Sequence, residues 1–238
     1  MSDLVRNGNP RISVNKFAEY ATSASAARRD RIVKEQLKPF DKPIPQRYAL
    51  AEKAIVEAFS APSGRWSEII FTHIERLRNQ SVSSKWHVDR KHSCIEALEN
   101  ILQLEDSLRL LNVTFTPGIR NSVGAILCSN VRIMLRPEVL LEGRVANKEQ
   151  FGAIKLAFSK THPMTSEGGV YVAMLMHQYQ QIVHGRVANP KMSFAIDVFQ
   201  RQIFKCPSAY KTRNSELEAA AQEYGQRWSF WQKRLSGH

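Results

Sequence analysis

The sequence predicts an α+β fold in which a helical N-terminal part precedes a strand-rich core and a C-terminal helix. Three observations lead to this prediction. Apolar residues in the first third recur at helical spacing, the middle of the chain changes to short segments rich in β-favouring residues, and the end returns to helical spacing. At 238 residues the chain is long enough to bury a sizeable core.

The first third is expected to hold several short helices. One apolar stripe at i, i+3, i+4 and i+7 is formed by Val14, Phe17, Ala18 and Ala21. A second helix is predicted from about Ser25, and two more over residues 47–59 and 67–80. Between them, prolines at 39, 43 and 45 predict an extended connector.

A longer helix is predicted from Ser93, because Ser93 and Glu96 stand at the spacing of a capping box. The apolar stripe that follows is formed by Cys94, Leu98, Ile101, Leu104, Leu108 and Leu111. We therefore place the start of the strand-rich core just before this helix. The expected division is a helical region over residues 1–84 and a core over residues 85–238.

The core is predicted to be a strand meander, a helix and a hairpin, followed by the C-terminal helix. Strands are expected within residues 123–143 and over 152–158, and a hairpin over 194–199 and 202–206. A helical stripe runs from Val172 to Val183 between them. The final helix carries an apolar face made of Leu217, Ala221, Tyr224, Trp228, Trp231 and Leu235.

The charge of the chain indicates an anionic partner. The formal net charge is +12 and the isoelectric point is near 9.8. Counterion release draws such a chain to a phosphate backbone, so we expect nucleic acid, DNA or RNA, as the partner. An anionic membrane surface or an acidic protein also fits a basic chain. The cationic side chains expected to carry binding are Arg28, Arg29, Arg31, Lys34, Lys211 and Arg213, with Tyr210 placed to stack on a base.

Other sequence features bear on the location of the protein. There is no run of about 18 apolar residues that would predict a membrane span, and the first residues lack the pattern of a secretory signal. The three cysteines, Cys94, Cys128 and Cys206, have neither metal-ligand nor disulfide spacing. We therefore expect a cytoplasmic protein without membrane association.

Two short motifs carry a resemblance to a known family. Pro137-Glu138 precedes one predicted strand, and Ala153-Ile154-Lys155 lies on the next. This pattern, with the order of helix, strand meander, helix and strand, resembles the PD-(D/E)XK nuclease superfamily over roughly residues 86–210. The resemblance implies a restriction-nuclease-like core, catalytic roles for Glu138 and Lys155, and Mg²⁺ or Mn²⁺ as the metal.

The chain departs from the family's motif at Ala153, which stands where the second carboxylate belongs. Alanine cannot bind a metal, so an active site requires an acid from elsewhere. The acids that we considered are Glu96, Glu99, Glu142, Glu149 and Asp197. Of these, Asp197 joins Glu138 as the expected metal-ligand pair.

Each motif residue also has a purely structural interpretation. Lys155 is then a strand lysine whose stem covers apolar surface while its amine reaches water. Glu138 is then a turn or edge carboxylate paired with Arg136.

Three functional hypotheses follow. The first is a nucleic-acid-binding protein with an incomplete nuclease-like core, as a subunit of a bacterial anti-phage defence or mobile-element assembly. The second is an active Mg²⁺- or Mn²⁺-dependent nuclease with a relocated acid. The third is a basic module that binds an acidic protein.

Overall fold

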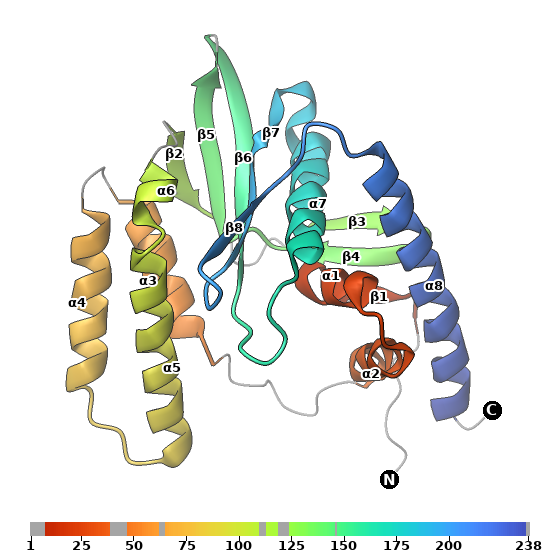
Figure 1. The fold of residues 1–238 in the computed structure, drawn as a ribbon, viewed down its shortest axis with the longest axis horizontal. Helices are drawn as coiled ribbons and strands as arrows, with labels where there is room; N and C mark the ends of the chain where they lie inside the picture. The colour runs from red at the N-terminus through yellow and green to blue at the C-terminus, as the bar shows by residue number, and fades with distance from the viewer. Residues whose placement is uncertain are drawn as a thin grey trace.

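A computed structural model describes residues 8–38, 47–61, 65–109, 113–118, 124–145 and 147–236. The predicted α+β class is confirmed, with a largely helical N-terminal part, two mixed β-sheets and a C-terminal helix (Figure 1). None of the described helices combines the length and the apolar character that crossing a membrane requires.

Helices dominate the first half of the chain, as expected. In chain order they are α1 (Val14–Thr22), α2 (Ala26–Leu37), α3 (Ala49–Phe59), α4 (Trp66–Asn79), α5 (Lys85–Leu102) and α6 (Glu105–Arg109), and α5 is the longest of them. Ser25 caps α2 by accepting a hydrogen bond from the Arg28 N–H, which confirms the predicted start of that helix.

The predicted start of the long helix is wrong. Helix α5 begins at Lys85, where the side chain of Ser84 caps it by accepting a hydrogen bond from the His87 N–H. Ser93 is buried inside the helix, so the spacing of Ser93 and Glu96 is not a capping box here. The helix also ends earlier than the apolar stripe predicts, because the chain turns at residues 103–104 and then forms α6.

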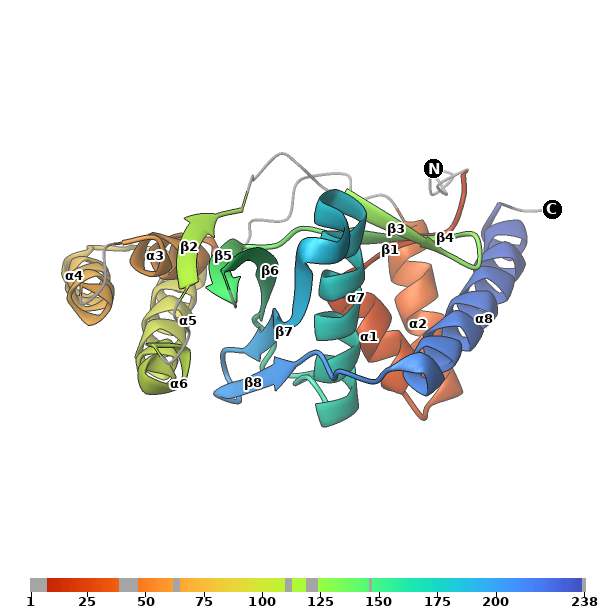
Figure 2. The same ribbon diagram turned by 90° about the horizontal axis from the view of Figure 1, so that it is seen from above.

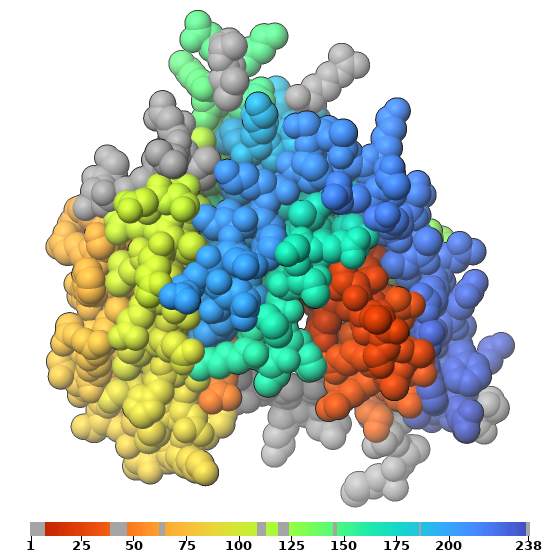
Figure 3. All heavy atoms as spheres, in the orientation of Figure 1, coloured from red at the N-terminus to blue at the C-terminus, as the bar shows by residue number. Residues whose placement is uncertain are grey.

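The large sheet contains five strands in the order β2 (Val113–Pro117), β5 (Val139–Val145), β6 (Lys148–Ala157), β7 (Ala188–Asp197) and β8 (Gln202–Lys205). Only β6 and β7 run parallel, and α7 (Ser166–His184) connects them through a short 3₁₀ turn (Gly185–Val187). The β7–β8 hairpin confirms the sequence prediction. The β5–β6 hairpin projects beyond the body of the molecule (Figure 3).

The small sheet was not predicted from the sequence as a separate unit. It has the order β1 (Arg11–Ser13), β4 (Val131–Leu135) and β3 (Gly124–Cys128), with β1 parallel to β4. It lies beside α7 and the C-terminal helix α8 (Lys211–Leu235) (Figure 2).

Two hydrophobic cores lie on opposite faces of the large sheet. The central core joins α3, α4 and α5 to one face, and the terminal core joins α1, α2, α7 and α8 to the other face and to the small sheet. Alternation along β6 explains the arrangement, because Ala153 faces the terminal core whereas Ile154 and Leu156 face the central core. Both cores contain residues from either side of residue 84, so the packing does not divide the chain there.

Glycine allows α7 to approach the sheet closely. A methyl group added at Gly169 would lie 2.1 Å from the ring of Phe204 on β8. The side chain of residue 169 therefore has to be a hydrogen atom for α7 to pack at this distance.

Candidate functional site

The side chain of Glu138 is buried at the start of β5. Glu138 immediately precedes β5, and its backbone N–H donates to the carbonyl of Ile154 at 3.0 Å, beside the Val139–Ile154 pair at which the β5–β6 ladder ends. Only 3% of the Glu138 side chain is exposed. The two charged residues of the motif therefore do come together, at neighbouring strands.

Both carboxylate oxygens of Glu138 are bound by groups of the protein. Lys155 Nζ forms an ion pair with Oε1, and the backbone N–H of Leu156 donates to Oε2 at 2.7 Å. Lys155 Nζ also donates to the carbonyl of Arg136 at 3.0 Å, and 12% of its side chain is exposed. The amine of Lys155 is therefore held by two acceptors of the protein.

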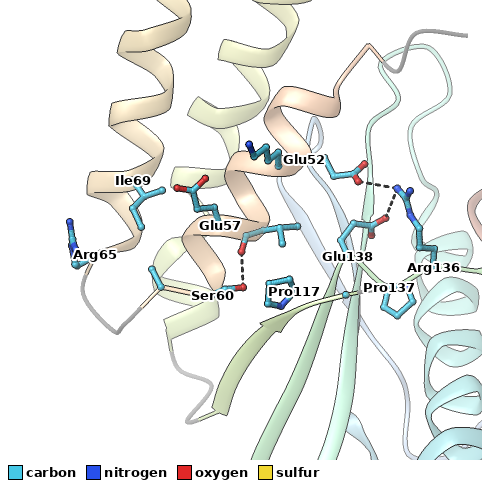
Figure 4. A pocket seen from close by; sticks show the side chains of 13 residues that line it. Glu52, Glu57, Ser60, Arg65, Ile69, Pro117, Arg136, Pro137 and Glu138 are labelled. Atoms are coloured by element: carbon cyan, nitrogen blue, oxygen red, sulfur yellow. Dashed lines mark hydrogen bonds and ion pairs between the residues drawn. The ribbon is translucent and has the colours of Figure 1, made fainter. Parts of the chain in front are cut away.

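A second ion pair extends the cluster to α3. The guanidinium of Arg136 lies 2.9 Å from Glu52 Oε1 and 3.8 Å from Glu138 Oε1 (Figure 4). The four side chains of this cluster alternate in charge, in the order Glu52, Arg136, Glu138 and Lys155, and their net charge is zero. The expected pairing of Glu138 with Arg136 is present, but as the weaker contact of a buried cluster.

Burial raises the pKa of the Glu138 carboxyl, and its contacts with Lys155 and the Leu156 N–H act in the opposite direction. The nearby carboxylate of Glu52 adds to the upward shift. A carboxylate in this position depends on its cationic partner to stay ionised.

A pocket of about 710 Å³ opens beside this cluster (Figure 4). Helix α3 and the start of α4 form one side, and the ends of β2 and β5 form the other. Glu52, Arg136 and Glu138 lie on its wall, and Val56, Ile69, Pro117 and Pro137 supply apolar lining. The cluster is therefore at the edge of a cavity that has space for a ligand.

The second expected metal ligand, Asp197, is occupied elsewhere. Its carboxylate accepts hydrogen bonds from the backbone N–H groups of Met164 at 2.8 Å and of Phe199 and Gln200 at 3.0 Å. It is fully buried and takes no part in the ion pairs of Glu138. Asp197 holds the turn after β7 and the loop before α7.

The other acids considered as replacements do not join Glu138 either. Glu96 pairs with Lys160, and Glu99 pairs with Arg78. Glu142 and Glu149 are exposed on the β5–β6 hairpin. The acid that does approach Glu138 is Glu52, which sequence reasoning missed because no motif near Glu52 distinguishes it from other acids on amphipathic helices.

The residues present do not fit a divalent metal ion. Mg²⁺ and Mn²⁺ are held by several free oxygen ligands, whereas both oxygens of Glu138 are bound and a guanidinium lies between Glu138 and Glu52. Ala153 is buried in the terminal core. Across the described ranges, no three His, Cys, Asp or Glu residues are grouped so that they could hold a metal.

The basic residues expected on α2 are mostly neutralised. Arg28 pairs with Glu19, and Arg29 pairs with Glu223 of α8 at 2.7 Å. Arg31, which is largely exposed, lies 3.1 Å from Glu35. Lys34 Nζ lies 3.5 Å from the centre of the Trp231 ring. The contacts of Arg28, Arg29 and Lys34 hold α2 against α1 and α8, whereas the Arg31–Glu35 pair lies within α2.

The second basic group lies at the start of α8. Lys211 and Arg213 are exposed in its first turn. The Tyr210 ring is half-buried and lies nearly perpendicular to the His177 ring, with 6.0 Å between the two ring centres. Arg29 contacts α8 at Glu223, which is twelve positions after Lys211. Twelve positions correspond to about 18 Å along the helix axis. The structure therefore does not bring the two basic groups together.

Comparisons with protein-family models and with curated proteins found no match to this chain.

Proposed function

We propose that this chain is a nucleic-acid-binding protein built on a nuclease-like core that does not hydrolyse its ligand. The succession of α5, β5, β6, α7 and β7, with β7 parallel to β6, supports the nuclease-like part. The predicted meander also included residues 124–135, which form β3 and β4 of the small sheet instead. Cores of this kind serve in bacterial defence and mobile-element assemblies, and the proposal extends to a subunit of such an assembly.

One observation carries the proposal. The two charged motif residues stand side by side, but each is occupied with the other, in a chain with a net charge of +12. Hydrolysis of a phosphodiester requires groups that are free to hold a metal or to activate water. Attraction of a phosphate backbone requires only the positive charge.

A direct test combines binding and cleavage in the same samples. The wild-type protein is mixed with duplex DNA or with single-stranded RNA in Mg²⁺, Mn²⁺ or EDTA, and gels report both shift and cutting. We expect binding without cutting in every condition. Glu138→Gln/Lys155→Met removes the buried pair while filling the same space, and we expect it to bind as the wild type does.

The matched control is Arg78→Gln/Glu99→Gln, which removes an exposed ion pair between α4 and α5 with the same change in charge. Metal-dependent cutting by the wild type, lost in the buried double variant and kept in the control, would overturn the proposal. Absence of any shift would overturn it as well.

A second candidate function is an active Mg²⁺- or Mn²⁺-dependent nuclease in which Glu52 supplies the missing acid. The observation in its favour is that Glu52 and Glu138 share Arg136 at the wall of one pocket. The arrangement in the structure does not fit a metal, so this function requires Arg136 to withdraw from between the two carboxylates and Lys155 to release Glu138. It predicts cleavage that Glu52→Gln abolishes, and the same gels measure that outcome.

A further inference from the structure

The outer face of the small sheet carries an uncompensated pair of arginines. Arg11 on β1 and Arg132 on β4 are register partners across a parallel strand pair, and both are exposed. Neighbouring strands lie about 4.8 Å apart, so the two side chains leave the sheet next to each other. Within the described ranges neither guanidinium has a hydrogen bond or an ion pair.

This pair differs from the other arginines that pack between elements. Arg28, Arg29, Arg136 and Arg227 are each matched by a carboxylate. Like charges set directly opposite each other on adjacent strands destabilise a sheet. A bound anion removes that repulsion, so the pair is a place where the fold itself favours an anionic ligand.

The backbone that presents the pair is held firmly. The Arg132 N–H donates to the carbonyl of Pro10 at 2.8 Å, and the Tyr224 hydroxyl donates to the carbonyl of Arg11 at 3.0 Å. On the inner face, Ile12 and Ile133 are buried in the terminal core. Alternation along the strands therefore directs both arginines outward.

The remaining side chains of this face extend the surface. Leu127 is the register partner of Arg132 on β3 and is 69% exposed. Ser13, Met134 and Ala125 form the adjacent row. No described helix or strand covers the face, which lies at the upper edge of the molecule in Figure 2, with α1, α2 and α7 on the other side of the sheet.

We infer that this outer face, centred on Arg11 and Arg132, binds the phosphate backbone of a DNA duplex. The inference rests on the proposed function and replaces α2 as the place where the ligand is held. None of the side chains described on this face is aromatic, so the bases of a single strand have nothing there on which to stack. Among the described residues of the face, Ser13 is the only neutral hydrogen-bonding side chain, so the face has little with which to recognise the 2′-hydroxyl groups of an RNA duplex.

The test measures how binding of a labelled DNA duplex depends on salt, by fluorescence anisotropy. Each lost phosphate contact lowers the slope of log K against log salt by about 1. We therefore expect Arg11→Gln/Arg132→Gln to bind more weakly and to lower the slope by about 2. Arg11→Lys/Arg132→Lys, which keeps both charges, should keep most of the slope.

The matched control is Arg76→Gln/Lys85→Gln, which removes two exposed charges from α4 and α5, on the far side of the molecule (Figure 1). We expect it to keep the wild-type slope. Thermal unfolding followed by circular dichroism reports whether each variant folds. The midpoint of Arg11→Gln/Arg132→Gln should equal or exceed that of the wild type, because a repulsion is removed.

The outcomes separate this inference from the proposed function. If the wild type binds the duplex and Arg11→Gln/Arg132→Gln keeps its slope, the inference is overturned and the proposed function stands. An equal loss in the control, or a preference for an RNA duplex over DNA, overturns the inference too. If the wild type binds no nucleic acid, both are overturned.

Discussion

The ion pair of Glu138 and Lys155 should show strong coupling between its two partners. Lys155→Met removes the cation that faces a carboxylate with only 3% of its side chain exposed. Loss of one partner from a buried pair destabilises a protein by about 3–5 kcal/mol, which is a large part of a total stability of about 5–15 kcal/mol. We expect the free energy of unfolding to fall by that amount.

The other substitutions should be milder. In Glu138→Gln the amide oxygen can still accept the hydrogen bond from the Leu156 N–H, and Lys155 keeps the Arg136 carbonyl. We expect Glu138→Gln to lower the free energy of unfolding by about 1–3 kcal/mol. Glu138→Gln/Lys155→Met leaves no unpaired charge at either position, so its stability should lie within about 1 kcal/mol of the wild type.

Urea denaturation followed by tryptophan fluorescence and circular dichroism measures all four proteins. If the effects of the two single substitutions simply add in the double variant, the cluster is not coupled and the reasoning fails. The comparison is valid only if the dependence of the unfolding free energy on urea is the same in all four.

The pH dependence of Lys155→Met gives an independent check. Burial raises the pKa of Glu138, and without the ammonium nothing of comparable strength opposes it. A carboxyl whose folded pKa exceeds its unfolded value stabilises the fold at pH below the unfolded value. That contribution is lost as pH rises through the folded pKa. The variant should therefore regain stability on acidification, by up to about 1.4 kcal/mol per pH unit, and a flat profile would contradict this.

Three further predictions concern packing, acid stability and capping. Gly169→Ala should destabilise by about 1–3 kcal/mol, since its methyl group meets an aromatic ring at 2.1 Å. Gly225→Ala, whose methyl group has ordinary contact at 3.7 Å, should stabilise by about 0.5–1 kcal/mol. A urea midpoint equal to that of the wild type would contradict the prediction for either glycine variant. Although burial opposes it, contacts with α8, including Arg227, lower the pKa of Asp30. Asp30 therefore stabilises the fold at pH above the pKa of an unfolded Asp carboxyl, and this stabilisation is lost as pH falls through the pKa of Asp30 in the folded protein. Arg227→Gln should make the loss of stability at acid pH less steep. Ser84→Ala should cost about 1 kcal/mol, because the N-cap of α5 is lost; an unchanged midpoint would argue against this cap.

Periodicity predicted the elements whose faces are buried on one side. Helix α8 follows its apolar stripe, with Leu217, Tyr224 and Trp228 buried. The start of α5 was missed because its first two turns carry few apolar residues and lie mostly at the surface. Strand β2 was missed for a related reason. It is a five-residue edge strand in which exposed and half-buried residues alternate, without the apolar run on which the prediction depended.

The motif predicted which strand residues meet, but not what they do together. The pairing of Val139 with Ile154 brings the adjacent residues Glu138 and Lys155 within reach of each other, so local spacing was sufficient. The position of Glu52 beside Arg136 depends on how α3 packs on the sheet, which is a property of the tertiary structure. In the same way, the partner of Arg11 is 121 positions away along the chain, on a strand whose parallel pairing has no signature in the sequence.

The terminal core has a consequence for how the chain folds as it is made. Asp30 on α2 and Arg227 on α8 are separated by 197 positions, so α1 and α2 leave the ribosome roughly 10–40 s before α8 at about 5–20 residues per second. All the helices and strands of the central core are synthesised within that interval. Tyr20, which ends fully buried against Tyr224 of α8, is without this partner throughout it. The apolar faces of α1 and α2 therefore lack the cover of α8 until that helix is complete.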